Sequence, residues 1–255
     1  MDLQVAVSGD GPDLVLLHGW GMDTAVWDEL AAHLALGFRI HNVALPGYGG
    51  SVPCMPYTLN GMVEMLVASL PPRVHVCGWS LGGQLALAWA MRYPAQIERL
   101  VLISTTPRFV KDDEWECAIP AAVLDDFEQS LERDCEGTLQ RFVLLQARND
   151  AELRAVSRSL RARTCGHGVS DTALLCAGLR LLRDTDLRGT LRRIAQPALI
   201  VHGDRDALVP VAAGAYLQRD LQNAILEIVA GAAHAPFVSQ PLLVARSISE
   251  FCSGR

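Results

Sequence analysis

Ser80 is the strongest candidate for chemistry, because it lies in the hexapeptide Gly78–Gly83 (Gly-Trp-Ser-Leu-Gly-Gly), which fits the pattern G-x-S-x-G. A short apolar run, residues 74–77, precedes the hexapeptide, and a helical pattern follows it directly. In this strand–turn–helix setting a strained turn presents a serine hydroxyl above a sheet, and the glycines let the two backbones approach closely. The helix N-terminus would help to stabilise negative charge. We therefore expect Ser80 to be a catalytic nucleophile.

A serine hydroxyl is a poor nucleophile until a histidine takes its proton, and an acid must orient that histidine. In enzymes that use such a turn, the chain order is serine, acid, histidine. Among the seven histidines, the candidates are His167, His202 and His234. We expect His167 to lie in a solvated loop and His202 to pack at the end of a strand. His234 lies in a loop of small residues before the last predicted helix, where its ring can reach across the sheet, so we expect it to be the base.

Two acids, Asp204 and Asp206, follow the penultimate predicted strand within residues 203–210 (Gly-Asp-Arg-Asp-Ala-Leu-Val-Pro). The spacing G-x-x-D-x-x-x-P places Asp206 deeper in the loop, where it can face His234. We expect Asp204 to pair with Arg205 or with solvent. The sequence therefore favours Asp206 as the acid.

Acyl transfer also needs two donors for the oxyanion, each contributing about 3 kcal/mol to the barrier. The backbone N–H of Leu81, directly after the serine, is one donor by geometry. The second should come from the loop after the first predicted strand, residues 18–21 (His-Gly-Trp-Gly), where we favour the N–H of Trp20. We interpret His18 as a structural residue of this loop. The rings of Trp20 and Trp79 either wall the site or pack in the core.

The elements that must position these residues alternate along the chain. Apolar runs closed by glycine or proline are typical of strands buried in a parallel sheet, and the longer patterned segments between them are typical of crossover helices. Residues 109–193 show no such strand and look helical nearly throughout. We predict an α/β core, residues 1–108 and 194–255, with a mostly parallel sheet flanked by helices and an all-helical cap, residues 109–193, inserted before the last two strands. The expected strands are 14–17, 38–45, 74–77, 100–103, 198–201 and 224–229, and the expected helices are 25–35, 60–70, 82–92 and 242–251.

Composition excludes several classes of function. The 255 residues carry 22 basic and 28 acidic side chains, a formal net charge of −6, which argues against nucleic acid as the main partner. No apolar run approaches the roughly 20 residues that span a bilayer, and the first residues do not resemble a signal peptide. The seven cysteines form no C-x-x-C pair, which favours free thiols in a reducing compartment. We expect a soluble cytoplasmic enzyme with no membrane partner, no metal and no cofactor.

Together, the loop at 18–21, the turn at 78–83, the Asp206 loop and His234 resemble the α/β-hydrolase family, over essentially the whole chain. Three segments, Gly78–Gly83, Ser104–Trp115 and Ala232–Phe237, are similar to a narrower family, the pimeloyl-[acyl-carrier protein] methyl ester esterases of biotin biosynthesis. The middle segment is the most specific, since general esterases have no reason to share it. The resemblance implies removal of a methyl ester from a pimeloyl chain that stays attached to its carrier protein, with release of methanol.

The resemblance also implies binding residues. The carrier-docking arginines of the family match Arg141, Arg154 and Arg158, whereas Gly137 stands at one further arginine position of the family. Independently, residues 137–163 hold six arginines against two acids in a chain of charge −6, and such a basic patch suits an acidic, phosphate-bearing partner. The substrate-binding residues implied are Trp20, Ser80, Leu81, Phe142, Val143, Leu144, Leu145, Gln146 and His234.

Two other functions remain open from the sequence. An enzyme of the same fold that cleaves small free esters or thioesters would use the same triad, with the cap as an ordinary lid. A non-catalytic binding module of this fold is the other alternative, although the intact Ser80, Asp206 and His234 argue against it. We expect a monomer.

Overall fold

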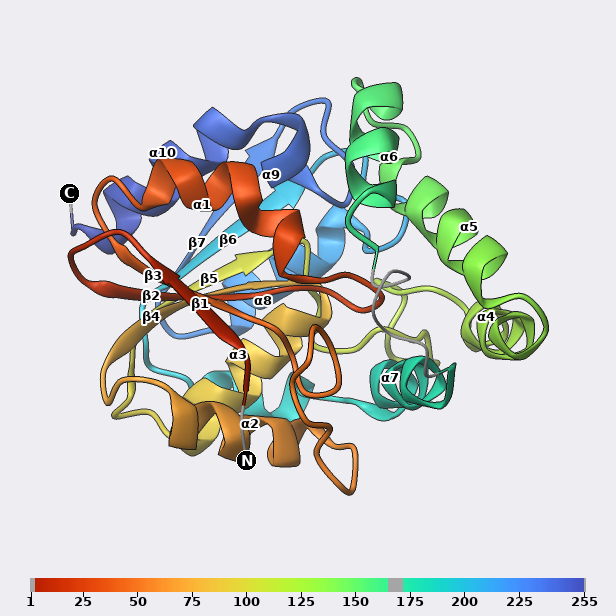
Figure 1. Cartoon of the computed structure of the whole chain (residues 1–255), viewed down its shortest axis with the longest axis horizontal. Helices are drawn as coiled ribbons and strands as arrows, with labels where there is room; N and C mark the ends of the chain where they lie inside the picture. The colour runs from red at the N-terminus through yellow and green to blue at the C-terminus, as the bar shows by residue number, and fades with distance from the viewer. Residues whose placement is uncertain (1–2, 165–171, 255) are drawn as a thin grey trace.

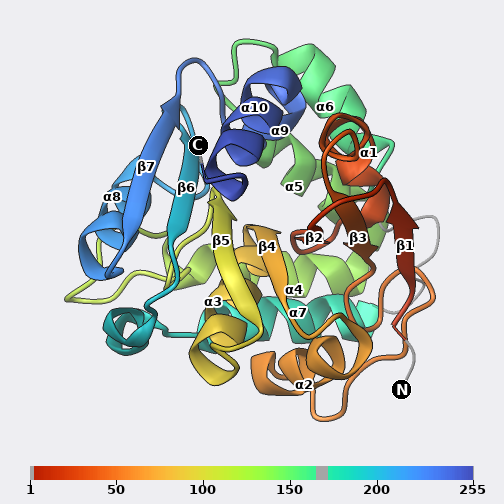
Figure 2. The ribbon, with the colours of Figure 1, turned by 90° about the vertical axis from the view of Figure 1, so that its left-hand side faces the viewer.

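The computed structural model describes residues 3–164 and 172–254, and within these residues seven strands form a single sheet. The strand order is β1-β3-β2-β4-β5-β6-β7, which Figure 2 shows running from one edge of the sheet to the other. All neighbouring strands are parallel except β1, which pairs antiparallel with β3 at one edge. The bounds are β1 Val5–Ser8, β2 Asp13–Leu17, β3 Arg39–Val43, β4 Val74–Trp79, β5 Ile97–Ile103, β6 Ala198–Gly203 and β7 Ala224–Val229.

Helices cover both faces of the sheet because its central strands are apolar on both faces. In β2, Leu14 and Leu16 pack on one side with α1 and α10, while Val15 and Leu17 pack on the other side with α2 and α3. Figure 1 shows these two helical layers with the sheet between them. The bounds are α1 Asp28–Leu34, α2 Leu59–Ser69, α3 Leu81–Arg92, α8 Val211–Asp220, α9 Pro236–Ser239 and α10 Pro241–Cys252.

The predicted α/β-hydrolase architecture is confirmed, with differences in detail. The helix expected over residues 25–35 is a 3₁₀ turn, η1 (Thr24–Trp27), followed by the shorter α1. The Asp23 carboxylate accepts a hydrogen bond from the Ala25 N–H and so begins the 3₁₀ turn before the α-helix. The edge strand β1 and the helix α8 were not expected from the sequence.

The helical cap lies between β5 and β6, as expected. Its described residues include α4 (Ala121–Arg133), α5 (Cys135–Ala147), α6 (Leu153–Arg161) and α7 (Thr172–Asp184), and these helices stand to one side of the sheet (Figure 1). The chain returns to the core through η3 (Arg188–Arg193). His167 lies outside the described residues. None of the helices in the described part of the chain is long and apolar enough to cross a bilayer.

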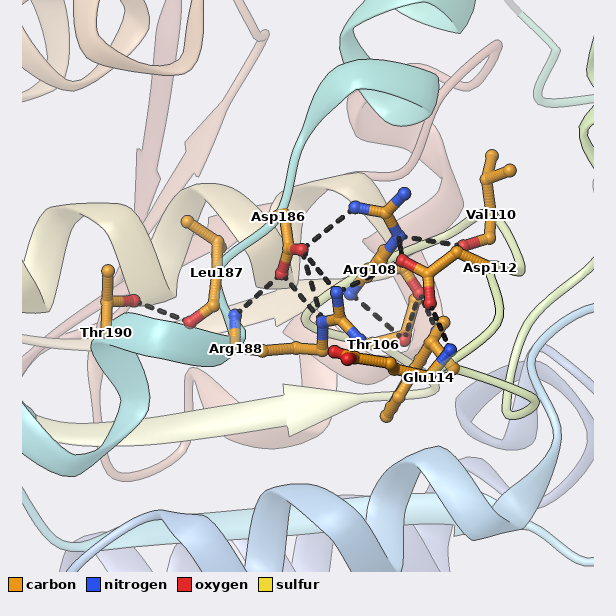
Figure 3. Close-up of polar contacts among 10 residues, drawn as sticks. Thr106, Arg108, Val110, Asp112, Glu114, Asp186, Leu187, Arg188 and Thr190 are labelled. Atoms are coloured by element: carbon orange, nitrogen blue, oxygen red, sulfur yellow. Dashed lines mark hydrogen bonds and ion pairs between the residues drawn. The ribbon is translucent and has the colours of Figure 1, made fainter.

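The two segments that connect the cap to the core lie side by side (Figure 3). Arg108 on the outgoing segment pairs with Asp186 on the returning segment at 2.8 Å, and Arg188 pairs with Asp112 at 3.1 Å. The Arg188 guanidinium also lies over the ring of Trp115. Burial raises the pKa of Asp186, but hydrogen bonds from Arg188 and Arg108 outweigh burial and lower that pKa to about 2. This ionic cluster therefore ties both ends of the cap together where they leave the core.

Candidate active site

Ser80 occupies a strained turn between β4 and α3. Its φ of 55° and ψ of −114° lie outside the ordinary regions for a residue with a side chain. The surrounding core holds this conformation: the Ser80 N–H donates to the Ile103 carbonyl at 3.0 Å, and the Thr105 hydroxyl donates to the Ser80 carbonyl at 2.7 Å. Thr105 belongs to the segment Ser104–Trp115, so this specific segment of the sequence also supports the turn that carries Ser80.

Glycines on both sides of the turn are required by close backbone approach. A Cβ at Gly82 would collide with the Leu17 carbonyl oxygen, and a Cβ at Gly78 would collide with the Gly82 carbonyl oxygen. Helix α3 can therefore approach strands β2 and β4 closely only because these positions carry no side chain. The serine at the tip of the turn is thereby brought to the carboxyl end of the sheet.

His234 and Asp206 form a buried pair beyond the ends of β7 and β6. The His234 Nδ1 atom lies 2.8 Å from Asp206 Oδ2, and both side chains are almost completely buried. The other carboxylate oxygen, Oδ1, accepts hydrogen bonds from the backbone N–H groups of Leu208 and Val209, at 2.9 Å each. His234 therefore donates from Nδ1, and its Nε2 is left as a basic nitrogen. Among the described residues, Nε2 has no hydrogen-bond partner although it is buried.

The charge on Asp206 is held by its surroundings. Burial raises the pKa of this carboxyl group, but His234 and His202 together outweigh the effect and lower the pKa well below its usual range. Asp206 therefore stays ionised throughout the neutral range. An ionised acceptor at Oδ2 keeps the proton of His234 on Nδ1, which is the tautomer that a general base needs.

His202 does more than pack at the end of β6. It is fully buried; its Nε2 donates to the Val209 carbonyl at 2.8 Å and lies 3.5 Å from Asp206 Oδ2. His202 therefore borders the same carboxylate as His234 and pins the loop that carries it. Of the two expectations for Asp204, exposure to solvent holds, whereas no ion pair with Arg205 is present among the described residues. Its Oδ1 accepts a hydrogen bond from the Gly231 N–H at 2.7 Å, in the loop before His234. For the contact between His202 and Asp206, the sequence offered only one signal, the i, i+4 spacing of these two residues.

The two expected oxyanion donors, the N–H groups of Leu81 and Trp20, lie on the α3 N-terminus and on the loop at residues 18–21. Leu81 is the first residue of α3, so its N–H has no acceptor within the helix. The Trp20 N–H donates to no described residue, and a Cβ placed on Gly19 beside it would lie 3.4 Å from the Ser80 Cβ, so this loop runs close to the serine. His18 supports this loop, since its Nε2 accepts from the Leu45 N–H at 3.1 Å and its Nδ1 donates to the Gly19 carbonyl at 2.9 Å. Burial lowers the pKa of His18 to about 4, which keeps the ring neutral in this role.

The cap residues expected to line the substrate site point in several directions, because consecutive residues of α5 encircle the helix. Phe142 meets the Trp20 ring edge-on at 4.8 Å, and the Gln146 carbonyl accepts from the His234 N–H at 3.1 Å. The side-chain nitrogen of Gln146 is buried, with no partner among the described residues. Val143 is buried in the part of the core that packs against α1 and α10, Leu145 is half-buried, and Leu144 is exposed.

Trp79 is buried beside His234, with the two ring centroids 5.6 Å apart. Its ring packs against Phe237 and Trp27, and its Nε1 donates to the His234 carbonyl at 2.8 Å. The ring is 1% exposed, so Trp79 is a rigid part of the core that holds the backbone of His234. Trp20 is also buried and donates from Nε1 to the Leu175 carbonyl of α7 at 3.0 Å. Trp20 thus joins the loop at residues 18–21 to the cap.

The three candidate docking arginines, Arg141, Arg154 and Arg158, are all exposed on α5 and α6. No carboxylate of the described residues forms an ion pair with any of them, in contrast to Arg180 on α7, which pairs with Glu128 at 2.6 Å. At Gly137, a Cβ would collide with the carboxylate of Asp134, which caps the start of α5. Within the described residues, no group of three or more histidine, cysteine or acidic side chains could hold a metal ion.

Comparison with known proteins agrees with this geometry. Residues 12–241 match the family model of the alpha/beta hydrolase fold. The chain is 40% identical over 248 residues to the pimeloyl-[acyl-carrier protein] methyl ester esterase of Nitrosospira multiformis, covering 94% of each chain. It is 43% identical over 235 residues to the enzyme of the same name from Aromatoleum aromaticum, covering 90% of this chain and 94% of the relative.

Solved structures show the same fold at lower identity. A bromoperoxidase from Bacillus anthracis superposes with a TM-score of 0.90 at 23% identity, covering 98% of this chain and 95% of the other. An esterase from Exiguobacterium antarcticum superposes with a TM-score of 0.86 at 22% identity, covering 98% and 94%. The family resemblance expected from the sequence is thus confirmed: this chain belongs to the α/β-hydrolase family and, within it, to the pimeloyl-[acyl-carrier protein] methyl ester esterases.

Proposed function

We propose that this protein hydrolyses the methyl ester of a pimeloyl chain carried on acyl-carrier protein, with Ser80, His234 and Asp206 as its catalytic triad. The observation that carries the proposal is the buried pair of Asp206 and His234 beside a strained serine turn. That constellation occurs in a chain about 40% identical, over nearly its full length, to relatives with this name. The step belongs to biotin biosynthesis, and the proposed location is the cytoplasm.

The reaction follows from the positions of these groups. The Ser80 hydroxyl attacks the ester carbonyl carbon while His234 Nε2 accepts its proton. The backbone N–H groups of Leu81 and Trp20 bind the oxyanion that forms. When the tetrahedral intermediate collapses, His234 returns the proton to the methoxy oxygen, methanol leaves, and the acyl group stays on Ser80. Water, deprotonated by His234, then releases the free carboxylate and restores the serine.

The cap completes the substrate site in this proposal. Residues 109–193 form the cap, and residues 1–108 and 194–255 form the core. Phe142 beside Trp20 supplies an apolar wall for the acyl chain, and Gln146 is tied to the base through its carbonyl, which accepts from the His234 N–H at 3.1 Å. Val143, Leu144 and Leu145 contribute through the rest of α5, with Leu144 at the exposed rim.

We assign carrier binding to the exposed face of α5 and α6. Arg141, Arg154 and Arg158 have no described acidic partner, so their charges are available to an acidic protein with a phosphate-bearing arm. The enzyme works as a monomer, needs no cofactor, and uses neither nucleic acid nor membrane as a partner.

The test is incubation with methyl pimeloyl-carrier protein, following methanol release and the mass of the carrier product. The product should lose one CH₂ unit, because the ester becomes an acid while the thioester remains. Ser80→Ala should be inactive in the same assay. Loss of the whole acyl chain would identify a thioesterase, and faster turnover of free methyl esters would identify a general esterase.

The carrier surface has its own test. Changing Arg141, Arg154 and Arg158 together to Ala should raise the KM for the carrier substrate about tenfold to a hundredfold, because each rim charge contributes about 0.5–1 kcal/mol. Hydrolysis of p-nitrophenyl acetate should hardly change. Arg180→Ala is the matched control, since Arg180 is an exposed cap arginine already paired with Glu128. Equal losses on both substrates would mean that the three arginines stabilise the cap instead.

A further inference from the structure

The loop that carries His234, residues 230–235, is held by the core and by the cap at the same time; we refer to it as the histidine loop. From the core, Asp204 accepts a hydrogen bond from the Gly231 N–H, and Trp79 donates one to the His234 carbonyl. From the cap, the Gln146 carbonyl accepts from the His234 N–H at 3.1 Å. The backbone on both sides of the base is therefore fixed by groups on two different parts of the fold.

Asp150 contributes a side-chain contact from the cap to this loop. It lies in the turn between α5 and α6, and its Oδ2 accepts a hydrogen bond from the Ala233 N–H at 2.8 Å, 83 residues away in the chain. Its Oδ1 accepts from the Glu152 N–H at 2.8 Å, so both carboxylate oxygens are used. The Ala151 N–H donates to the Gly231 carbonyl at 2.8 Å and closes the connection in the reverse direction.

The environment of Asp150 is unusual for a carboxylate. The residue is only 6% exposed, and no basic side chain of the described residues forms an ion pair with it. Its charge is therefore satisfied by backbone N–H groups, and hydrogen bonds of this charge-assisted kind are stronger than neutral ones. Removing one partner of such a buried bond leaves the Ala233 N–H without an acceptor. The bond from the Ala233 N–H to Asp150 is therefore a strong restraint on the histidine loop, although it involves only one side chain.

We propose that Asp150 is a positioning residue, which holds the histidine loop to the cap and thereby sets the position of the His234 ring for catalysis. This inference rests on the proposed role of His234 as the base. Ala233 directly precedes His234, so a shift of its backbone moves the imidazole relative to Ser80. A misplacement of about 1 Å at a reacting group can cost on the order of a hundredfold in rate. The same turn joins the two helices that carry the docking arginines, so a carrier that binds there contacts the element that supports the base.

Asp134 offers a matched control within the same domain. It also lies at the start of a cap helix, and its carboxylate accepts a hydrogen bond from the Gly137 N–H at 2.9 Å. This bond is exposed, and the described contacts of the Asp134 side chain stay within the cap. Asp134→Ala and Asp150→Ala both remove an aspartate that caps a local turn, but only the second removes a bond to the histidine loop.

The experiment measures kcat and KM for p-nitrophenyl acetate, a small ester that does not need the carrier surface, together with the Tm of each variant. Asp150→Ala should lower kcat about tenfold to a hundredfold and change KM less than about threefold. Asp134→Ala should lower the Tm but leave kcat within about twofold of the wild type. A kcat for Asp150→Ala equal to that of Asp134→Ala, in folded protein, would overturn the proposal.

Asp150→Asn keeps the test decisive if the alanine variant does not fold. The asparagine side chain has one oxygen acceptor for two N–H groups, so kcat should still fall, by about threefold to thirtyfold. An unchanged kcat in this variant would also overturn the proposal. Ser80→Ala separates the two hypotheses: hydrolysis that persists in this variant rejects the proposed function itself. Abolished hydrolysis in Ser80→Ala, combined with full activity of the Asp150 variants, rejects only the positioning role.

Discussion

Replacing Asp206 by asparagine preserves the shape of the side chain while changing which atoms can donate and accept hydrogen bonds. Asp206 Oδ1 accepts from two backbone N–H groups, those of Leu208 and Val209, at 2.9 Å each. An asparagine must turn its only oxygen toward these donors, because an NH₂ group there would face two N–H groups. Its NH₂ would then face His234 Nδ1, where the carboxylate oxygen now lies at 2.8 Å.

The consequence for His234 is a change of tautomer. With an NH₂ donor opposite Nδ1, the ring is most stable with its proton on Nε2, so Nε2 can no longer accept the proton of Ser80. His202 cannot compensate, because its Nε2 already donates to the Val209 carbonyl at 2.8 Å. In serine hydrolases this substitution lowers kcat by about 10⁴, which corresponds to about 5 kcal/mol in the barrier. We expect a loss of the same order for Asp206→Asn.

The assay is kcat for p-nitrophenyl acetate, with Asp204→Asn as the matched control. Asp204 accepts one hydrogen bond, from the Gly231 N–H, and an asparagine oxygen can accept it equally well. The control should therefore lose less than about tenfold in kcat. A small loss for Asp206→Asn would refute the tautomer argument, and reversed losses for the two variants would assign the acid to Asp204.

Three further predictions concern the turn, the triad and the cap connection. Ester hydrolysis should be abolished by Ser80→Ala and equally by His234→Ala. The double variant should lose no more activity than either single variant, because the two residues act as a unit. An additive loss in kcat would contradict the assignment. Gly82→Ala should lower the free energy of unfolding, measured in urea, by at least about 3 kcal/mol, because the added Cβ collides with the Leu17 carbonyl. Gly37→Ala is the control and should change stability little, because a Cβ there meets open space. Equal effects of the two substitutions would contradict the close-approach argument. Asp186, with its pKa lowered to about 2, should stabilise the fold above about pH 4 and lose that contribution as the pH falls toward 2. Because the side chain is partly exposed, Asp186→Asn should cost about 1 kcal/mol in urea unfolding at pH 7, and a difference from wild type that persists near pH 2 would contradict the ionic origin.

The buried parallel strands and the serine turn were predictable because their signals are local. Strands β2 and β6 each contain an uninterrupted apolar run that is buried on both faces. In β5 only residues 100–103 form such a run, because Glu98 and Arg99 precede it, and in β4 the apolar run is broken by His75 alone. Strand β1 has no such run: Val5–Ser8 is largely exposed at the edge and depends on pairing with β3. Helix α8 was missed because its sequence, Val-Ala-Ala-Gly-Ala-Tyr-Leu-Gln-Arg-Asp, buries few large apolar residues.

The candidate site was predictable only in part. The choice of Asp206 over Asp204 rested on loop spacing, and the structure places Asp206, and not Asp204, against His234. Its catalytic role stays a prediction. The contact of Asp150 with Ala233 joins residues 83 positions apart, and no local pattern marks a buried aspartate whose partners are backbone N–H groups. Such contacts depend on how the cap packs on the core, which periodicity does not report.

Ser80 and His234, the proposed nucleophile and base, are therefore held by different parts of the fold. Two hydrogen bonds hold the Ser80 turn to the core: one to Ile103 at the end of β5, and one from Thr105, two residues further along the chain. The histidine loop is held by Asp204 and Trp79 from the core and by Gln146 and Asp150 from the cap. A movement of α5 and α6 against the core would thus displace His234 while leaving Ser80 in place. The proposed carrier surface lies on those same two helices. The position of the cap therefore links carrier binding to proton transfer by His234, a link that the sequence motif around Ser80 does not contain.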